Sequence, residues 1–203
     1  MARIEKRIRY GIEMLEVLDI PDIRKRIARI TIERYHRMID LGVFDEWSVE
    51  LLNGVLVEKI SKSELHVYLV DLLVELIREF CSGSEFWVRK EDPVTIGNSE
   101  PEPDVSVVKG SRSQFRHSKP ATAHFVIEVS NSSLGLDRAK ARDYAKAGIP
   151  EYWIVRPDSD LTEVYREPKD GEYAEMMEMP SGTTLESSAL QGFSFNLAEA
   201  LAE

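Results

Sequence analysis

The spacing of apolar residues changes several times along the chain, and each change predicts a new element. The sequence predicts helices over residues 3–18, 31–41, 63–81 and 137–147. The first and third follow from near-helical apolar spacing. The second follows from a capping residue, Thr31, and a stop at Gly42, and the fourth from its stop at Gly148 and Pro150. The third is the clearest, because its apolar residues form a broad stripe. The stripe consists of Leu65, Leu69, Leu72, Leu73, Leu76, Ile77 and Phe80.

Alternating or continuous apolar runs predict the strands. Asn53-Gly54 separates two such runs, and this dipeptide supplies the positive φ angles of a tight hairpin turn. The predicted strands cover residues 49–52, 55–58, 86–96 (interrupted by Pro93), 104–109, 125–129, 152–155, 161–166 and 173–177. Residues 193–201 form a tail that we expect to pack on the sheet. Helices and strands interleave, which predicts an α/β (α+β) fold with a mixed central sheet flanked by helices.

Composition narrows the protein class. The 203 residues suffice for one domain with a substantial core. The formal net charge of −10 argues against a protein whose whole surface grips nucleic acid, although a local basic cleft remains compatible with it. The single cysteine, Cys81, forms no internal disulfide, and no apolar run reaches the roughly 20 residues that span a bilayer. We therefore expect a cytoplasmic protein with no membrane segment.

Two carboxylates on neighbouring predicted strands are the candidate ligands of a metal site. Asp104 opens the run 105–108, which alternates like a half-buried strand. Glu128 interrupts the apolar run 125–129, where an unpaired carboxylate is costly to bury. Carboxylate oxygens suit magnesium, which usually takes one or two of them. An equally open alternative is that Asp104 begins a turn and Glu128 pairs with a structural Arg or Lys.

A series of short motifs resembles one known family. In order, they are Glu50-Leu51-Leu52-Asn53-Gly54, His66, Pro103-Asp104-Val105, Ile127-Glu128-Val129-Ser130, Lys140 with Tyr144, and residues 147–155 (AGIPEYWIV). The series looks like the Uma-two family of bacterial putative restriction endonuclease domains, within the PD-(D/E)xK nuclease superfamily. The likeness covers roughly residues 31–200. It leaves residues 1–30 as an N-terminal helical extension of a domain over residues 31–203.

The resemblance implies a restriction-endonuclease-like fold and a Mg²⁺ (or Mn²⁺) dependent endonuclease that hydrolyses DNA phosphodiester bonds. Asp104 and Glu128 match the two metal carboxylates, and the main-chain carbonyl of Val129 is a candidate third ligand. Glu50 matches a further acidic residue at the sheet edge. His66 has a simpler interpretation as a helix-start residue that packs near the site.

The residue that supplies the catalytic positive charge is harder to assign, because Ser130 stands where the superfamily usually has its lysine. The resemblance implies that this lysine lies on the next helix instead. Lys140 matches it there, because it lies four residues before Tyr144 and on the same helix face. The segment before Lys140 is one residue shorter than the family pattern, so Arg138 and Lys146 remain alternatives.

Two other functions use the same residues. One is a catalytically silent binding or scaffold module that keeps the nuclease fold. The other is a hydrolase of a small phosphorylated molecule. For the nuclease, the expected partners are DNA and a second copy of the chain in a homodimer.

Overall fold

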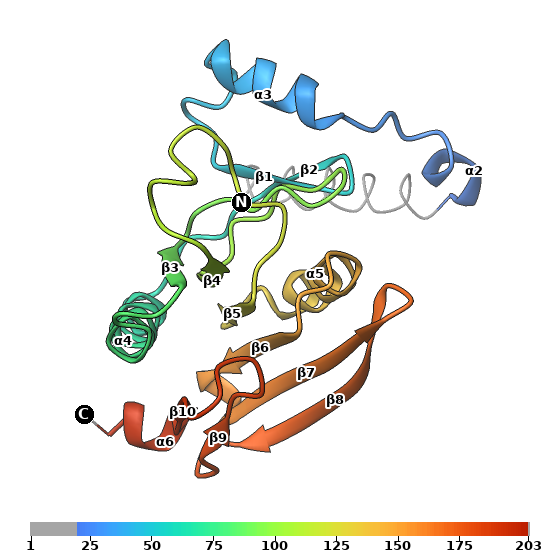
Figure 1. The fold of residues 1–203 in the computed structure, drawn as a ribbon. Coiled ribbons are helices and arrows are strands. Elements are labelled where there is room, and N and C mark those ends of the chain that lie inside the picture. Colours follow the sequence, from blue (N-terminus) through green and yellow to red (C-terminus); the bar gives the residue numbers. More distant parts are fainter. Residues whose placement is uncertain (1–19, 203) are drawn as a thin grey trace. The chain divides into compact units, whose positions relative to one another are not determined.

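The computed structural model describes residues 20–202 (Figure 1). These residues fall into two units, which meet in the sequence between Ile30 and Thr31. The first contains the short helix α2 (Pro21–Arg24), with proline at its start, where the missing N–H is not needed. The helix predicted over residues 3–18 lies outside the described part.

The second unit is built around one mixed sheet. Strands β3 to β8 pair in the order β3-β4-β5-β6-β7-β8, and only β5 and β6 run parallel. This confirms the predicted fold class. The elements are α3 (Ile32–Asp40), β1 (Val49–Leu52), β2 (Val55–Glu58), α4 (Glu64–Phe80), β3 (Phe86–Lys90), β4 (Val105–Lys109), β5 (Phe125–Val129), α5 (Leu134–Lys146), β6 (Glu151–Arg156), η1 (Pro157–Ser159), β7 (Leu161–Lys169), β8 (Glu172–Pro180), β9 (Leu185–Glu186), β10 (Ser194–Phe195) and α6 (Leu197–Ala200).

Local chemistry explains several element boundaries. Thr31 and Ser63 cap α3 and α4, and each side-chain oxygen accepts a hydrogen bond from the first helical turn. Asn53 and Gly54 join β1 to β2 with φ angles of 49° and 78°, as a primed hairpin turn requires. No helix within residues 20–202 is long and apolar enough to cross a membrane.

The strand predicted over residues 86–96 is shorter than expected. It ends at Lys90, because Glu91 adopts a φ angle of 52° that extended backbone does not allow, and Pro93 cannot donate to a ladder. Beyond this point the chain leaves the sheet. Val94 and Ile96 then pack on the sheet face that also holds Tyr144.

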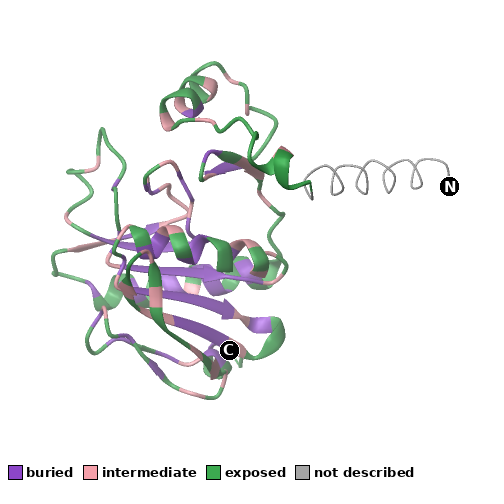
Figure 2. Ribbon diagram, turned by 90° about the vertical axis from the view of Figure 1, so that its right-hand side faces the viewer, coloured by how far each residue is buried: buried purple, intermediate pink, exposed green. Residues whose placement is uncertain are grey.

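The sheet is covered on both faces, which corrects the half-buried pattern predicted for residues 105–108. All four of these residues are buried, and Figure 2 draws the inner strands of the sheet in the purple of buried residues. Helix α4 packs against β3, β4 and β5, whereas α5 packs against β6, β7 and β8. A strand between two covered faces must be buried along its length, so the serine at position 106 is enclosed as well.

Helix α5 begins three residues earlier than predicted, at Leu134. The backbone N–H of Asp137 already donates to the carbonyl of Ser133, at 3.0 Å. This is the first bond of the helical ladder, and it makes the preceding turn part of the helix.

The C-terminal tail completes the core beside α4, as predicted. Phe193, Phe195 and Leu197 are buried in the same cluster as Trp153. The loop before the tail is held by a buried carboxylate, that of Glu151 at the start of β6. Its four hydrogen bonds come from Ser187 Oγ (2.6 Å), the Ala189 N–H (3.0 Å), Trp153 Nε1 (2.9 Å) and Arg166 Nε (2.8 Å).

We predict that Glu151→Ala destabilises the fold by about 3 kcal/mol, because it leaves several buried donors without an acceptor. Chemical denaturation monitored by circular dichroism measures this free energy of unfolding. Glu172→Ala, an exposed glutamate on β8, is the control and should change it by less than about 0.5 kcal/mol. Equal effects of the two substitutions would contradict the prediction.

The same carboxylate predicts a pH dependence of stability. Burial acts to raise the pKa of Glu151, but the hydrogen bonds from Ser187, Ala189, Arg166 and Trp153 outweigh it and hold the pKa below its ordinary value. The stabilisation is therefore fully present above the ordinary glutamate pKa of about 4.3 and is lost as pH falls through the lower, folded-state pKa. In Glu151→Gln this acid-dependent loss should shrink in the same denaturation assay.

Candidate active site

Asp104 and Glu128 face each other where the β4–β5 ladder stops. The last ladder pair is Val105 with Ile127, so the next position on each strand carries a carboxylate. Each carboxylate accepts a hydrogen bond from the backbone of the other strand. The Asp104 N–H donates to Glu128 Oε2 at 3.1 Å, and the Val129 N–H donates to Asp104 Oδ2 at 2.8 Å. These bonds replace the missing ladder bonds and fix both side chains.

Lys140 reaches the same point from α5. Its Nζ lies 3.1 Å from Glu128 Oε1, 3.1 Å from Glu50 Oε1 and 3.6 Å from Asp137 Oδ1. Burial acts to lower the pKa of Lys140, but the carboxylates of Glu128, Glu50 and Asp137 outweigh it and raise the pKa above its ordinary value. Lys140 is therefore a lasting positive charge and not a base that accepts a proton.

Tyr144 lies one helical turn beyond Lys140 on the same face of α5. Its hydroxyl donates to Glu128 Oε1 at 3.0 Å, and the whole side chain is buried. Burial also raises the pKa of the Tyr144 phenol well above its ordinary value, and Glu128 and Glu50 add to the rise. The phenol thus stays protonated as a donor that orients Glu128.

The cluster holds more carboxylates than its one buried lysine balances. Glu50, Asp104, Glu128 and Asp137 are all buried. Burial raises the pKa of Glu128 well above its ordinary value; Lys140 opposes this rise, and the three other carboxylates add to it. Burial likewise raises the pKa of Asp137. A further positive charge at this place would relieve the repulsion.

His66 lies closer to the cluster than its sequence position suggested. Both ring nitrogens face oxygen atoms: Nδ1 is 2.9 Å from the Val129 carbonyl, and Nε2 is 3.1 Å from Asp104 Oδ1. The ring can donate both bonds only when it is protonated. Burial acts to raise the pKa of Asp104, but His66, the Val129 N–H and Lys62 outweigh it and lower the pKa below its ordinary value.

Two lysines between the hairpin and α4 were missed by the sequence analysis. Lys62 Nζ lies 3.0 Å from Glu91 Oε1 and 3.4 Å from Asp104 Oδ1, and Lys59 pairs with Glu102. The signal for them was weak, because two lysines in a polar connection are ordinary. Their acidic partners are distant in sequence, so only the fold brings them together.

The two alternative cations lie elsewhere. Arg138 binds Glu163 on β7 through two hydrogen bonds, of 3.0 Å and 2.6 Å. Lys146 packs its side chain against Gly171, in the turn between β7 and β8. Arg138 is two residues from Lys140 on the helix and so points to another face. Of the three candidate cations, only Lys140 joins the carboxylates.

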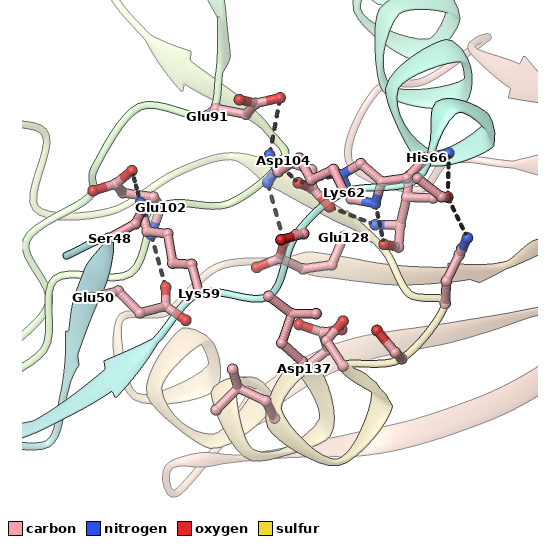
Figure 3. Close-up of a pocket in the computed structure, with 18 of the residues that line it drawn as sticks. Ser48, Glu50, Lys59, Lys62, His66, Glu91, Glu102, Asp104, Glu128 and Asp137 are labelled. Atoms are coloured by element: carbon pink, nitrogen blue, oxygen red, sulfur yellow. Dashed lines mark hydrogen bonds and ion pairs between the residues drawn. The ribbon is translucent and has the colours of Figure 1, made fainter. Parts of the chain in front are cut away.

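The cluster lines an open cavity of about 560 Å³ (Figure 3). Residues 59–63 form one wall, and residues 131–133 line it as well. Asn131 Nδ2 donates to Ser63 Oγ at 2.9 Å and so links these two segments. In Figure 3, Asp104 and Glu128 lie together, with Lys62 and His66 beside Asp104. The cavity gives a ligand direct access to the carboxylates.

The donor set fits a magnesium ion that keeps most of its waters. Within residues 20–202, no group of three or more His, Cys, Asp or Glu side chains is arranged to hold a metal ion. Magnesium, however, commonly uses only one or two carboxylates together with water and substrate phosphate. Asp104 and Glu128 supply these hard oxygens, Val129 lines the same cavity, and the excess of buried acid favours a cation.

Comparisons with known proteins bear on the family and the fold. The profile of the Uma2 family, described as "Putative restriction endonuclease", matches residues 32–198. Among solved structures, the fold is similar to that of a protein from Anabaena variabilis ATCC 29413, described as a putative nuclease belonging to DUF820. The TM-score is 0.64 at 18% sequence identity, over 77% of this chain and 91% of that one. No curated protein matches the chain significantly.

We predict that Mn²⁺ binds weakly at Asp104 and Glu128 and that Asp104→Ala abolishes this binding. The reason is that the substitution removes one of only two carboxylate ligands. Isothermal titration calorimetry of the folded proteins measures the affinity. Glu75→Ala, an exposed carboxylate on α4, is the control and should bind as the wild type does. Undiminished binding by Asp104→Ala would place the metal elsewhere.

Proposed function

Because the chain belongs to the Uma2 family of "Putative restriction endonuclease" proteins, we propose that it is a metal-dependent endonuclease that hydrolyses phosphodiester bonds in DNA. The observation that carries this proposal is the convergence of Asp104, Glu128 and Lys140 on one open cavity. Two carboxylates with a fixed ammonium are the parts needed to hold a divalent cation beside a phosphate.

Asp104 and Glu128 would hold the metal, with the Val129 carbonyl as a third oxygen donor. When bound, Mg²⁺ or Mn²⁺ supplies a water of lowered pKa and positive charge for the phosphate oxygens. The protein contributes rigidity, because backbone amides and Tyr144 fix the orientation of both carboxylates. Preorganised ligands need little rearrangement when substrate arrives.

Lys140 would stabilise the negative charge that develops on the phosphate. Its raised pKa keeps the ammonium charged, so it acts as an electrostatic group and a hydrogen-bond donor. Asp137 and Glu50 hold it from two sides, and both line the cavity with it. Glu50 also accepts the backbone N–H of Glu102 at 3.2 Å, which fixes its position at the edge of the site.

A catalytically silent binding or scaffold module that keeps the nuclease fold is the second candidate. The observation that favours it is the acidic balance of both chain and cavity, since the formal net charge is −10 and six of the lining residues are acidic. Without a bound cation, such a cavity repels a phosphate backbone. The nuclease therefore depends on metal, and DNA cleavage that requires Mg²⁺ or Mn²⁺ separates the two candidates.

We predict that Lys140→Ala reduces DNA cleavage on the order of 100- to 1000-fold, because one preorganised electrostatic contact to the transition state is lost. Plasmid cleavage with Mg²⁺ and with Mn²⁺ measures the rate, and Asp104→Ala is the inactive reference. Arg138→Ala is the matched control from the same helix. It should keep much more activity, because Arg138 binds Glu163 away from the cavity.

Lys140→Ala leaves buried carboxylates unpaired, so Lys140→Gln is tested beside it as a variant that keeps a hydrogen-bond donor. Thermal unfolding monitored by circular dichroism identifies the variants that remain folded. A folded Lys140→Gln protein with wild-type cleavage would refute the role of the lysine. A wild type that cleaves neither single- nor double-stranded DNA with either metal would leave the scaffold module as the better function.

A further inference from the structure

The connection between β4 and β5 has an unusual charge composition for this chain. Residues 105–127 contain four lysine or arginine side chains and no aspartate or glutamate, although the whole chain carries a formal net charge of −10. The basic side chains gather at residues 109–119. We call residues 110–119 the basic loop. A cationic segment in an acidic protein is the expected footprint of a polyanionic partner.

The basic loop is anchored at several points. Phe115 stacks on Trp87 of β3, with ring centroids 5.8 Å apart and an interplanar angle of 22°. Near its start, the Ser111 N–H donates to Gln114 Oε1 at 2.7 Å. At its end, Lys119 pairs with the buried Glu100. These contacts hold the backbone in a defined shape, so the loop presents its exposed side chains from a supported position.

Arg112 and Arg116 are the side chains that this shape presents. Both are exposed, and neither forms an ion pair within residues 20–202. In contrast, Lys109 at the end of β4 pairs with Glu85 at 3.1 Å, and Lys119 is held by Glu100. The two arginines are therefore available to an external anion. A guanidinium donates paired hydrogen bonds that match the oxygens of a phosphate.

The position of the loop relates it to the candidate active site. Asp104 precedes β4 and the basic loop follows it. The loop then returns to Lys119, which pairs with Glu100, four residues before Asp104. The end of the loop is therefore held by the segment that leads into the candidate active site.

We propose that Arg112 and Arg116 form a second DNA-backbone contact, which holds duplex DNA whose phosphodiester bond lies at the candidate active site. The inference rests on the proposed function, because it treats DNA as the ligand of that site. It also explains how an acidic protein retains a polyanion: binding energy comes from the basic loop, and chemistry takes place in the acidic, metal-binding cavity.

The test measures binding of the full chain to a fluorescent duplex of about 20 base pairs by anisotropy, in EDTA and at several salt concentrations. For Arg112→Ala/Arg116→Ala we expect the Kd to rise on the order of 10-fold at low salt, and the slope of log K against log salt to fall by about 2. Arg112→Lys/Arg116→Lys keeps the charge and should restore most of the slope.

The matched control is Arg78→Ala/Lys169→Ala, which removes the same charge from exposed positions on α4 and at the end of β7. It should leave the salt slope within experimental error of the wild type. Equal weakening by the two double variants would overturn the inference, because it would show an effect of net charge alone. Tighter binding to polyglutamate than to the duplex would also overturn it, and would assign the loop to an acidic protein.

Single-turnover cleavage separates this inference from the proposed function. With saturating duplex and Mg²⁺, Arg112→Ala/Arg116→Ala should cleave at the wild-type rate, while its half-saturating DNA concentration rises. If the wild type cleaves DNA but the double variant has an unchanged Kd, the inferred DNA contact of the basic loop is overturned and the proposed function is not. Loop-dependent binding without any cleavage supports the loop and overturns the nuclease.

Discussion

The buried ammonium of Lys140 is the interaction on which the candidate site depends. It contacts carboxylates from three different elements, β1, β5 and α5. Without it, Glu50, Glu128 and Asp137 would face one another in a place where water screens them poorly. The positive charge of Lys140 thus allows several carboxylates to be buried close together in the folded protein.

The site is held by backbone as much as by charge. Where the β4–β5 ladder stops, Asp104 and Glu128 each bind an N–H of the opposite strand. Tyr144 and His66 then fix the remaining oxygens from the two helices. A carboxylate restrained in this way loses little entropy when it takes a ligand, and it also keeps its neighbour in place.

Much of the fold could be predicted from the sequence. The apolar stripe over residues 63–81 and the turn at Asn53-Gly54 are local signals, and the structure confirms the elements that they predicted. The strand over residues 86–96 was too long, because the left-handed conformation of Glu91 is not visible in an apolar pattern. The full burial of residues 105–108 was missed, since it depends on what covers each face of the sheet.

The candidate site could also be predicted only in part. Asp104, Glu128 and Lys140 were predicted from motif order, and the structure brings them together, although their roles remain a proposal. The position of His66 against Asp104 and the pairing of Lys62 with Glu91 follow from tertiary contacts more than 25 residues apart. No local spacing encodes such contacts.

The parallel pairing of β5 with β6 has a consequence for how the site assembles during folding. Parallel neighbours need a crossover, and α5 is that crossover, so Glu128 and Lys140 belong to one β-α-β unit and are only 12 residues apart. Contacts this close in sequence have a small loop-closure cost. Glu50 lies on a hairpin far earlier in the chain. Glu128 and Lys140 can therefore come together when one β-α-β unit forms. Glu50 joins them only when the hairpin packs against that unit.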